Sequence, residues 1–251
     1  MKSPLRYPGG KSRASKILFA FFPKGIKEVV SPFFGGGSLE LMLAESGVQI
    51  FGYDLFVPLV EFWNAVKNDR ENLIQKCMNL QSKMDRDYFR GLQVDLRYYN
   101  IDNKTDRAAA YFALNRSSFS GTVLSGGSSP GFPRFNIASI NRIRDIDMTN
   151  INIEAKHFKD SIIDNEDKFL YCDPTYLLEN SNLYGEAGSL HKTFKHDKLK
   201  NLLTSRKRWI LSYNDCAEIR DMYKGYEFLT PEWKYGMSTE KQSNEVLIIN
   251  Y

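Results

Sequence analysis

The sequence predicts an α/β fold in which a mainly parallel sheet is interrupted by a mostly helical insert. Two segments, Glu28 to Asp54 and about Asn152 to Tyr251, alternate strand-like and helix-like hydrophobic patterns. Such β-loop-α-β units build parallel sheets. Residues 55–150 between them show mainly helical spacing. We therefore predict one domain made of residues 1–54 and 151–251, with a second domain inserted at 55–150.

The first segment predicts one strand–loop–helix–strand unit. Three consecutive glycines follow an apolar strand, and Ser38 is the expected cap of the next helix, with Gly47 as its C-terminal stop. The second strand ends near Asp54. The expected strand, helix and second strand lie at 29–34, 39–45 and 48–51.

The remaining elements divide into a helical group and a strand-rich group. In the insert, apolar residues at helical spacing predict helices at 59–68, 70–80 and 107–114. The glycine- and serine-rich stretch 117–133 then predicts a long loop or hairpin, and loops of this length are usually functional or disordered. Toward the C-terminus, apolar runs predict three strands and one helix, at 169–172, 209–212, 246–249 and 196–203.

The composition excludes several classes of protein. Of 251 residues, 42% are hydrophobic and 25% are charged, which excludes a wholly disordered chain. The net charge of +4 is compatible with a nucleic-acid partner. Three cysteines without a C-x-x-C pair and three histidines without an H-E-x-x-H pattern predict no disulfide framework and no metal site. The apolar run 17–22 is too short to span a membrane and no secretory signal is visible, so we expect a cytoplasmic protein with no membrane partner.

A glycine-rich loop and a later aspartate predict a ligand that contains a nucleoside. The loop, Phe33 to Gly37, lets a ligand approach the backbone between a strand and a helix. Asp54 lies 18 residues after Gly36, at the end of the next strand, where an acid can bind ribose hydroxyls. The loop is not G-x-G-x-x-G, which disfavours a dinucleotide-dependent oxidoreductase. A glycine turn beside a surface aspartate is the alternative interpretation.

Two further motifs each contain a charged side chain that could contact a ligand. Asp173 to Tyr176 directly follow a buried strand, and ligands of open α/β sheets bind at the carboxyl ends of strands. Leu5 to Lys11 contain a Pro-Gly-Gly turn, from which Lys11 can neutralise a carboxylate while Tyr7 packs on an apolar part of a ligand. Either motif alone also fits a structural turn.

Taken in order, these motifs resemble those of the Dam-type (D12 class) DNA adenine methyltransferases, and their order is similar to that of the alpha group. The motifs are Tyr7 to Lys11, Phe33 to Gly37, Asp54 and Asp173 to Tyr176, and the similarity covers nearly the whole chain. The resemblance implies a Rossmann-like class I methyltransferase sheet with an inserted target-recognition domain. It also implies site-specific methylation of adenine N6 in DNA by base flipping, with S-adenosyl-L-methionine as methyl donor.

The resemblance assigns a set of cofactor-binding positions to this sequence. The glycine loop falls on the site of the methionine moiety, Asp54 on the ribose-binding acid, and Phe158 on an aromatic residue that lies against the cofactor's adenine. The neighbouring His157 receives no role. The complete set is Tyr7, Lys11, Phe34, Gly35, Gly37, Asp54, Phe158 and Asp173.

The chemistry of methylating an amine agrees with the motif at 173–176. The lone pair of the adenine amine is delocalised into the ring, and two acceptors aimed at its two hydrogens favour the tetrahedral geometry needed for attack. Asp173 supplies a carboxylate, Pro174 a backbone carbonyl, and Tyr176 a ring that can stack on the base. The donor is already a sulfonium, so no metal is needed. Thr175 replaces the family's usual second proline, which keeps the acceptor carbonyl but affects the rigidity of the turn.

The insert resembles the part of the family that contacts DNA. Arginine is the commonest reader of guanine in the major groove, and Arg116 and Arg134 can read a base or bind a phosphate. Phe119, Phe132 and Phe135 either wedge into the base stack or anchor the loop in the core. The predicted DNA-binding residues are Asn115, Arg116, Ser118 and Arg134.

Several partners and alternatives follow from this interpretation. The expected partner is double-stranded DNA, a cognate restriction endonuclease stays open, and a monomer or weak dimer encoded by a bacterium or phage is expected. The stretch Leu177 to Lys195 is either a lid over the flipped base or a connecting loop. Methylation of cytosine N4 or RNA is an alternative reaction. A DNA-binding module with decayed catalysis, suggested by Thr175, is an alternative of another class.

Overall fold

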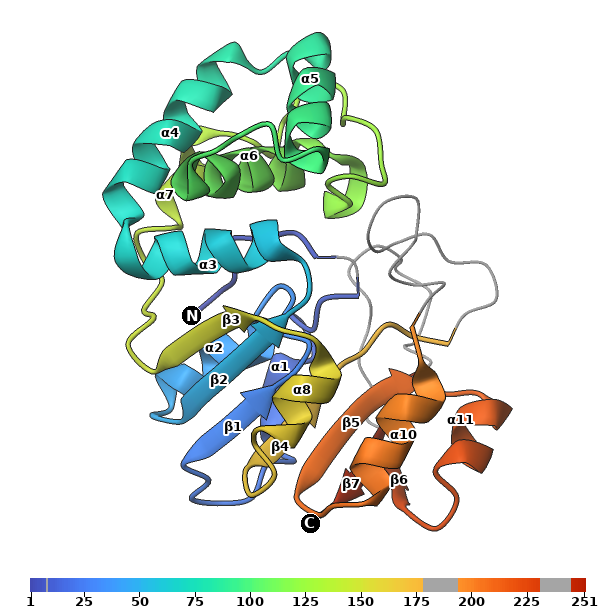
Figure 1. The fold of residues 1–251 in the computed structure, drawn as a ribbon. Coiled ribbons are helices and arrows are strands. Elements are labelled where there is room, and N and C mark those ends of the chain that lie inside the picture. The colour runs from blue at the N-terminus through green and yellow to red at the C-terminus, as the bar shows by residue number, and fades with distance from the viewer. Residues whose placement is uncertain (8, 178–193, 231–244) are drawn as a thin grey trace.

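The computed structural model describes residues 1–7, 9–177, 194–230 and 245–251, and a seven-stranded sheet forms its centre (Figure 1). The strand order is β3-β2-β1-β4-β5-β7-β6. Strands β1 to β5 pair in parallel, whereas β7 runs antiparallel to both β5 and β6. The strands are β1 (Glu28–Ser31), β2 (Gln49–Asp54), β3 (Ile151–Ala155), β4 (Phe169–Cys172), β5 (Trp209–Asn214), β6 (Glu227–Leu229) and β7 (Glu245–Asn250).

Helices cover both faces of the sheet, which confirms the predicted α/β class. In Figure 1, α1 and α2 lie behind the sheet and α8 and α10 in front of it. These helices, with α11, are α1 (Ser15–Phe19), α2 (Ser38–Glu45), α8 (Phe158–Ile163), α10 (His196–Thr204) and α11 (Ala217–Met222). Strand β4, at the centre of the sheet, is buried along its whole length because both of its faces are covered. Val29 packs into the core on one face, and its neighbour Val30 packs into the core on the other.

The remaining helices gather at one end of the molecule (Figure 1). They are α3 (Val57–Asn68), α4 (Arg70–Lys83), α5 (Arg86–Arg97), α6 (Lys104–Ser117), the 3₁₀ turn η1 (Phe119–Gly121) and α7 (Ile137–Asn141). Helix α3 packs against β2 and β3 as well as against α6. The division into domains at residues 55 and 150 therefore stays a prediction, because α3 packs mainly with the helical group but also covers part of the sheet.

Two details of the first predicted unit are wrong. Strand β1 ends at Ser31, so Phe33 and Phe34 lie in the loop after it rather than in the strand. Ser38 is the first residue of α2 and not its cap, a position taken by Gly37 at φ 65°. A Cβ on Gly37 would lie 2.7 Å from Cε1 of Phe34, so the chain turns tightly around the Phe34 ring, and only glycine fits there. Gly47, at φ 91°, stops α2 as predicted.

The other predicted helices and strands are confirmed within a few residues, but eight of the described elements were not predicted. Six of them, α1, η1, α7, α8, α11 and β6, are too short to show a period in the sequence. Strand β3 also escaped prediction, as did α5, which buries Phe89, Leu92 and Leu96 at helical spacing behind the N-cap Asp85. His157, for which no role was predicted, caps α8 because its Nδ1 accepts from Lys159 N at 3.1 Å.

Candidate active site

The predicted motifs meet at one edge of the sheet, at the carboxyl ends of four neighbouring strands. Phe158 follows β3, Asp54 ends β2, the glycine loop follows β1, and Asp173 follows β4. Asp54 lies in register with Ala155 of β3, which brings it close to the start of α8. This edge is where ligands bind in open α/β sheets.

Asp54 fixes the glycine loop through both of its carboxylate oxygens. Oδ2 accepts from Gly35 N at 3.0 Å, and Oδ1 accepts from Phe56 N at 2.9 Å. Burial raises the pKa of Asp54, and these backbone hydrogen bonds oppose that rise. A carboxylate oxygen can accept more than one hydrogen bond, so Asp54 keeps acceptor capacity for a hydroxyl group.

Two aromatic side chains, those of Trp63 and Tyr7, pack against the glycine loop. Trp63 of α3 donates its Nε1–H to Gly35 O at 3.1 Å and lies edge-on to Phe34, with ring centroids 5.6 Å apart. Tyr7 lies over the loop, because a Cβ on Gly36 would come within 2.8 Å of Tyr7 Cβ. The structure therefore brings Tyr7, Phe34, Gly35 and Asp54 together, as predicted from their motifs.

An aromatic cluster lies beside Asp54. The ring centroids of Phe158 and Phe33 are 5.5 Å apart, and Phe194 lies 5.2 Å from Phe158 and 5.7 Å from Phe33. The ring of His157 lies 4.5 Å from that of Phe158. Of these residues only Phe158 was predicted. Phe33 had a signal in the glycine loop, whereas Phe194 is brought in by the fold from a distant segment.

Lys11 lies at the motif 173–176 and not beside Asp54. Its Nζ donates to Asp173 Oδ1 and to the hydroxyl of Tyr176, both at 2.7 Å, and lies 5.0 Å from the centroid of the Tyr176 ring. Lys11 is only 5% exposed. Burial raises the pKa of Asp173, and the charge and hydrogen bond of Lys11 oppose that rise. A buried ion pair thus holds the acceptor group of the predicted catalytic motif.

The turn after Asp173 is tied to the neighbouring strand. Leu177 N donates to Asn214 Oδ1 at 2.9 Å, and Asn214 Nδ2 donates back to Leu177 O at 2.9 Å. This pair holds the turn that contains Thr175 in place without a second proline. Residues 178–193, which the sequence predicts to form either a lid or a connecting loop, lie outside the described residues.

Two more buried carboxyls face Lys11. Glu245 Oε1 at the start of β7 lies 3.5 Å from Lys11 Nζ, and Glu40 of α2 accepts from Ser31 Oγ at 2.7 Å. Burial is the main cause that raises the pKa of Glu40 and of Glu245 to about 7 each. The sequence showed neither residue as part of the site, because both come from elements distant along the chain.

Within the described part of the chain, no group of histidine, cysteine and acidic residues is arranged to hold a metal.

Three of the four predicted DNA-binding side chains are directed inward. Asn115 accepts from Arg6 N at 2.9 Å and donates to Arg6 O at 2.7 Å. Arg116 donates from Nε to Arg134 O at 2.9 Å and from Nη1 to Pro4 O at 3.3 Å. Burial lowers the pKa of Arg116 to about 10. The buried Ser118 Oγ accepts from Val123 N at 3.1 Å, so Arg134 is the exposed member of the set.

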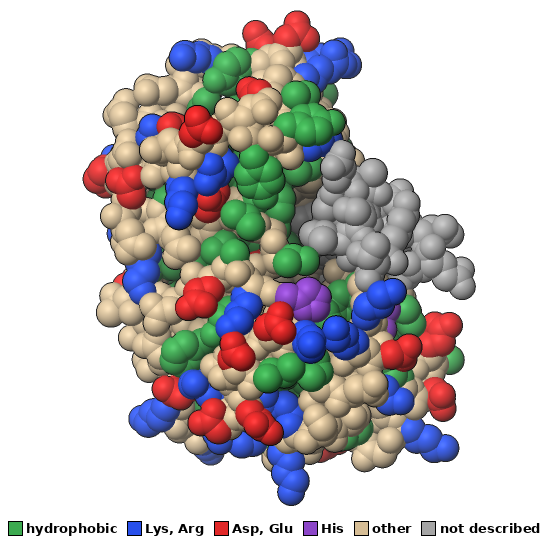
Figure 2. Space-filling view, in the orientation of Figure 1, with side chains coloured by type: hydrophobic (Ala, Val, Ile, Leu, Met, Phe, Trp, Pro, Cys, Tyr) green, Lys and Arg blue, Asp and Glu red, His purple; other side chains and the backbone are tan. Residues whose placement is uncertain are grey.

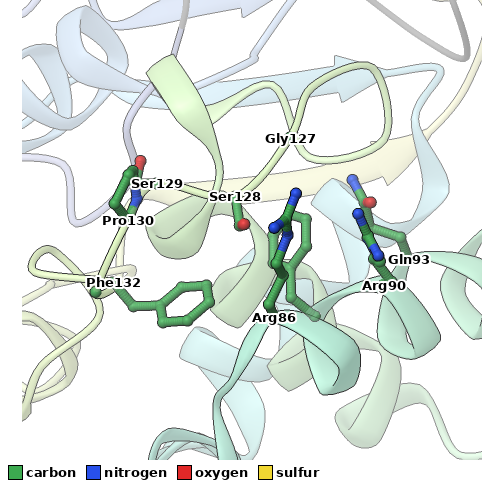
Figure 3. A pocket seen from close by; sticks show the side chains of 10 residues that line it. Arg86, Arg90, Gln93, Gly127, Ser128, Ser129, Pro130 and Phe132 are labelled. Carbon is green, nitrogen blue, oxygen red and sulfur yellow. The ribbon is translucent and has the colours of Figure 1, made fainter.

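The glycine- and serine-rich loop lies against helix α5 and closes a cavity of about 470 Å³ with it (Figure 3). Arg86, Arg90 and Gln93 rise from α5 on one side, and Ser128, Ser129, Pro130 and Phe132 lie along the other. Gln93 Nε2 donates to the carbonyls of Val123 and Gly126 at 2.5 and 2.9 Å, which fixes the loop to the helix. Arg86 and Arg90 are exposed.

A family model for D12 class N6 adenine-specific DNA methyltransferases matches residues 7–237. The chain belongs to this family. Its reaction is therefore the transfer of a methyl group to N6 of adenine in DNA, and its substrate is DNA. The sheet described above is the Rossmann-like methyltransferase fold that the motifs implied.

Two relatives of the chain are named as methyltransferases, one of them as a methylase of adenine in DNA. The type II methyltransferase M.CviBI of Paramecium bursaria Chlorella virus NC1A is 22% identical over 253 residues, covering 94% of this chain and 91% of the relative. The DNA adenine methylase of Haemophilus influenzae is 22% identical over 243 residues, covering 89% of this chain and 83% of the relative. Across the described residues, no helix is long and apolar enough to cross a membrane.

Proposed function

We propose that this D12 methyltransferase binds S-adenosylmethionine along the edge formed by the glycine loop, Asp54 and the Phe158 cluster. The residues fit the cofactor, because Asp54 keeps acceptor capacity for the ribose hydroxyls and the rings of Phe33, Phe158 and Phe194 offer an apolar surface for its adenine. The cofactor supplies a methyl group on a positively charged sulfonium. Tyr7 and the backbone of 35–37 hold the end of the site nearest Asp173.

In this proposal the carboxylate of Asp173 and the backbone carbonyl of Pro174 each accept a hydrogen bond from one N–H of the target amine. The observation that carries it is the position of Asp173 directly after β4, next to the glycine loop after β1. A carboxylate and a carbonyl that accept hydrogen bonds from N6 favour the tetrahedral geometry that the nitrogen needs to attack a sulfonium methyl group. The N–C bond would form as the bond from that methyl group to sulfur breaks, and the methylated amine would then release one proton. Tyr176 stacks on the flipped base. The Leu177–Asn214 clamp supports activity despite Thr175, which argues against a decayed module.

Methyl transfer from labelled S-adenosylmethionine to unmethylated duplex DNA, followed by nucleoside analysis, tests this proposal. We expect the label in N6-methyladenine, and none in duplexes whose adenines are already methylated at N6. Label in N4-methylcytosine would contradict the assigned target. Cofactor and DNA binding without any transfer would instead support the alternative of a decayed module.

We further propose that DNA is contacted through Arg134 and through the surface made by α5 and the loop 117–133. Asn115 and Arg116 then act indirectly, because they hold the N-terminal segment that carries Tyr7 and Lys11. In Figure 2, basic and acidic side chains are interspersed, so no broad patch of one sign marks this face. Arg86 and Arg90 lie one helical turn apart beside the loop, at the spacing that lets both reach one stretch of phosphates.

Replacing Arg86 and Arg90 together by alanine is expected to weaken DNA binding at all sequences alike. Each lost phosphate contact should reduce the slope of log K against log salt by about 0.9. The measurement is fluorescence anisotropy of a labelled duplex over a series of salt concentrations. The matched control is Lys24→Ala with Lys27→Ala, two exposed lysines before β1 at the opposite edge of the sheet. An unchanged salt slope for the arginine variant would refute the contact.

The type II names of relatives support a restriction–modification setting for this chain. In that setting a cognate restriction endonuclease is its partner, and the enzyme acts in the cytoplasm. A monomer suffices, because each strand of a duplex site is methylated separately. Sedimentation of the enzyme with and without its duplex measures this stoichiometry.

A further inference from the structure

Glu245 is a buried carboxylate that is poorly satisfied by hydrogen bonds. The residue is 3% exposed, and within the described part of the chain neither Oε1 nor Oε2 has a hydrogen bond of ordinary geometry, although Lys11 and Tyr176 both lie close enough to lower the pKa of Glu245. The opposite charge that faces it is Lys11 Nζ, at 3.5 Å. Leaving a buried charged acceptor unsatisfied costs stability. The poor hydrogen bonding of Glu245 is explained if, in a second arrangement of its neighbours, one of them donates a good hydrogen bond to its carboxylate.

Lys11 is the neighbour that can do so. Its ammonium group carries three donors on a flexible stem, and it now donates to Asp173, to Tyr176 and, at 3.4 Å, to Gly9 O. The distance from Nζ to Glu245 Oε1 is 0.8 Å longer than the distance to Asp173 Oδ1. Rotation about the terminal bonds of the lysine covers that difference without any movement of the backbone.

The ion pair with Lys11 weakens Asp173 as an acceptor for the target amine. The Asp173 carboxylate can accept further hydrogen bonds, but it accepts them less strongly while an ammonium group lies 2.7 Å away, because that positive charge offsets its own. The proposed reaction needs Asp173 to accept from the target amine. Asp173 accepts from N6 most strongly when Lys11 loosens from it, and a buried ammonium group that loosens needs another partner.

We propose that Glu245 is the positioning residue that takes Lys11 from Asp173 when the target adenine docks. The inference rests on the proposed role of Asp173 as an acceptor for N6. The exchange transfers hydrogen bonds only, since no proton leaves Lys11 and no covalent bond changes. In the free enzyme Lys11 holds Asp173 in place, and in the complex it forms an ion pair with Glu245.

The exchange depends on pH, because only ionised Glu245 can receive Lys11. Burial raises the pKa of Glu245 to about 7, with Lys11 opposing and Asp173 adding to the rise. The methyl-transfer rate should then rise with pH through this range. The other titratable groups that face the site are Glu40 of α2, Tyr171 of β4 and Tyr176.

The substitution Glu245→Gln tests the proposal in single-turnover methyl transfer, measured from below to above the Glu245 pKa. We expect the rate at high pH to fall by about 10- to 100-fold, by analogy with the range seen when the outer hydrogen-bond partners of metal ligands are removed. The rise of the rate with pH should also disappear. Thermal stability should stay the same or increase, because the change removes one of several like charges from a buried cluster. Affinity for cofactor and DNA should stay at wild-type values.

The matched control is Glu40→Gln, an equal change in the same cluster at a residue whose hydrogen bond goes to Ser31. It should keep the rise with pH, and its rate should fall less. A wild-type rate and pH profile in Glu245→Gln would overturn the inference, as would a lower melting temperature with a parallel loss of cofactor binding. Asp173→Asn is measured alongside: if that variant stays active, the proposed role of Asp173 fails, and if it is inactive, the result for Glu245 stands on its own.

Discussion

Replacing Asp173 by alanine is expected to reduce the rate of methyl transfer by at least about 10²- to 10³-fold, the cost of removing one preorganised group that stabilises a transition state. Asp173 is the only charged acceptor in the motif 173–176, and it lies at the end of β4 with its carboxyl held by Lys11. Without it, the backbone carbonyl of Pro174 is the one acceptor left in the motif for N6. The measurement is a single-turnover rate with saturating cofactor and DNA.

The loss should be confined to the chemical step. Lys11 retains Glu245 as a counter-ion in the variant, so the site keeps a compensated charge and the protein should fold. Cofactor affinity should change far less than the rate, because Asp54 and the aromatic cluster are untouched. The control is Asp215→Asn, a carboxylate after β5 that pairs with Arg220 at 2.6 Å and should leave the rate unchanged. A fall in rate that simply followed weaker cofactor binding would contradict an acceptor role.

Much of this site could be predicted from the sequence because it consists of short motifs that follow strands. A strand, a glycine loop and a later aspartate place a ligand at a sheet edge once the strands are parallel. The motif order was enough to bring Phe34, Asp54 and Asp173 to the same edge, as the structure has them.

What sequence reasoning missed are contacts between distant segments. Lys11 and Glu245 come from opposite ends of the chain, and no local pattern shows that they share a buried cluster with Asp173. For Arg116 the local pattern gave a wrong expectation. An arginine before a glycine-rich loop is usually on the surface, but Arg116 lies in the buried last turn of α6. Its side chain donates to backbone carbonyls of two other segments.

Trp63 joins α3 to the glycine loop of the proposed cofactor site. Of the substitutions considered, replacing Trp63 by alanine should have the largest effect on the stability of the protein. Trp63 is fully buried, packs against Phe34 and Phe62, and donates to Gly35 O. Deleting a buried tryptophan side chain costs about 3–5 kcal/mol of unfolding free energy. Because a domain has only about 5–15 kcal/mol in total, the variant should be partly unfolded near physiological temperature. Urea denaturation measures the change.

The variant Trp63→Phe separates packing from the hydrogen bond. Phenylalanine keeps most of the apolar contact with Phe34 but leaves Gly35 O without its donor, at a cost of about 1–3 kcal/mol. Gly35 also donates to Asp54, so loosening its carbonyl should release the loop and weaken cofactor binding more than stability alone explains. Calorimetric titration with S-adenosylmethionine checks this. Unchanged affinity in Trp63→Phe would show that Asp54 alone holds the loop, and an alanine variant losing less than about 1 kcal/mol would contradict the core role of Trp63.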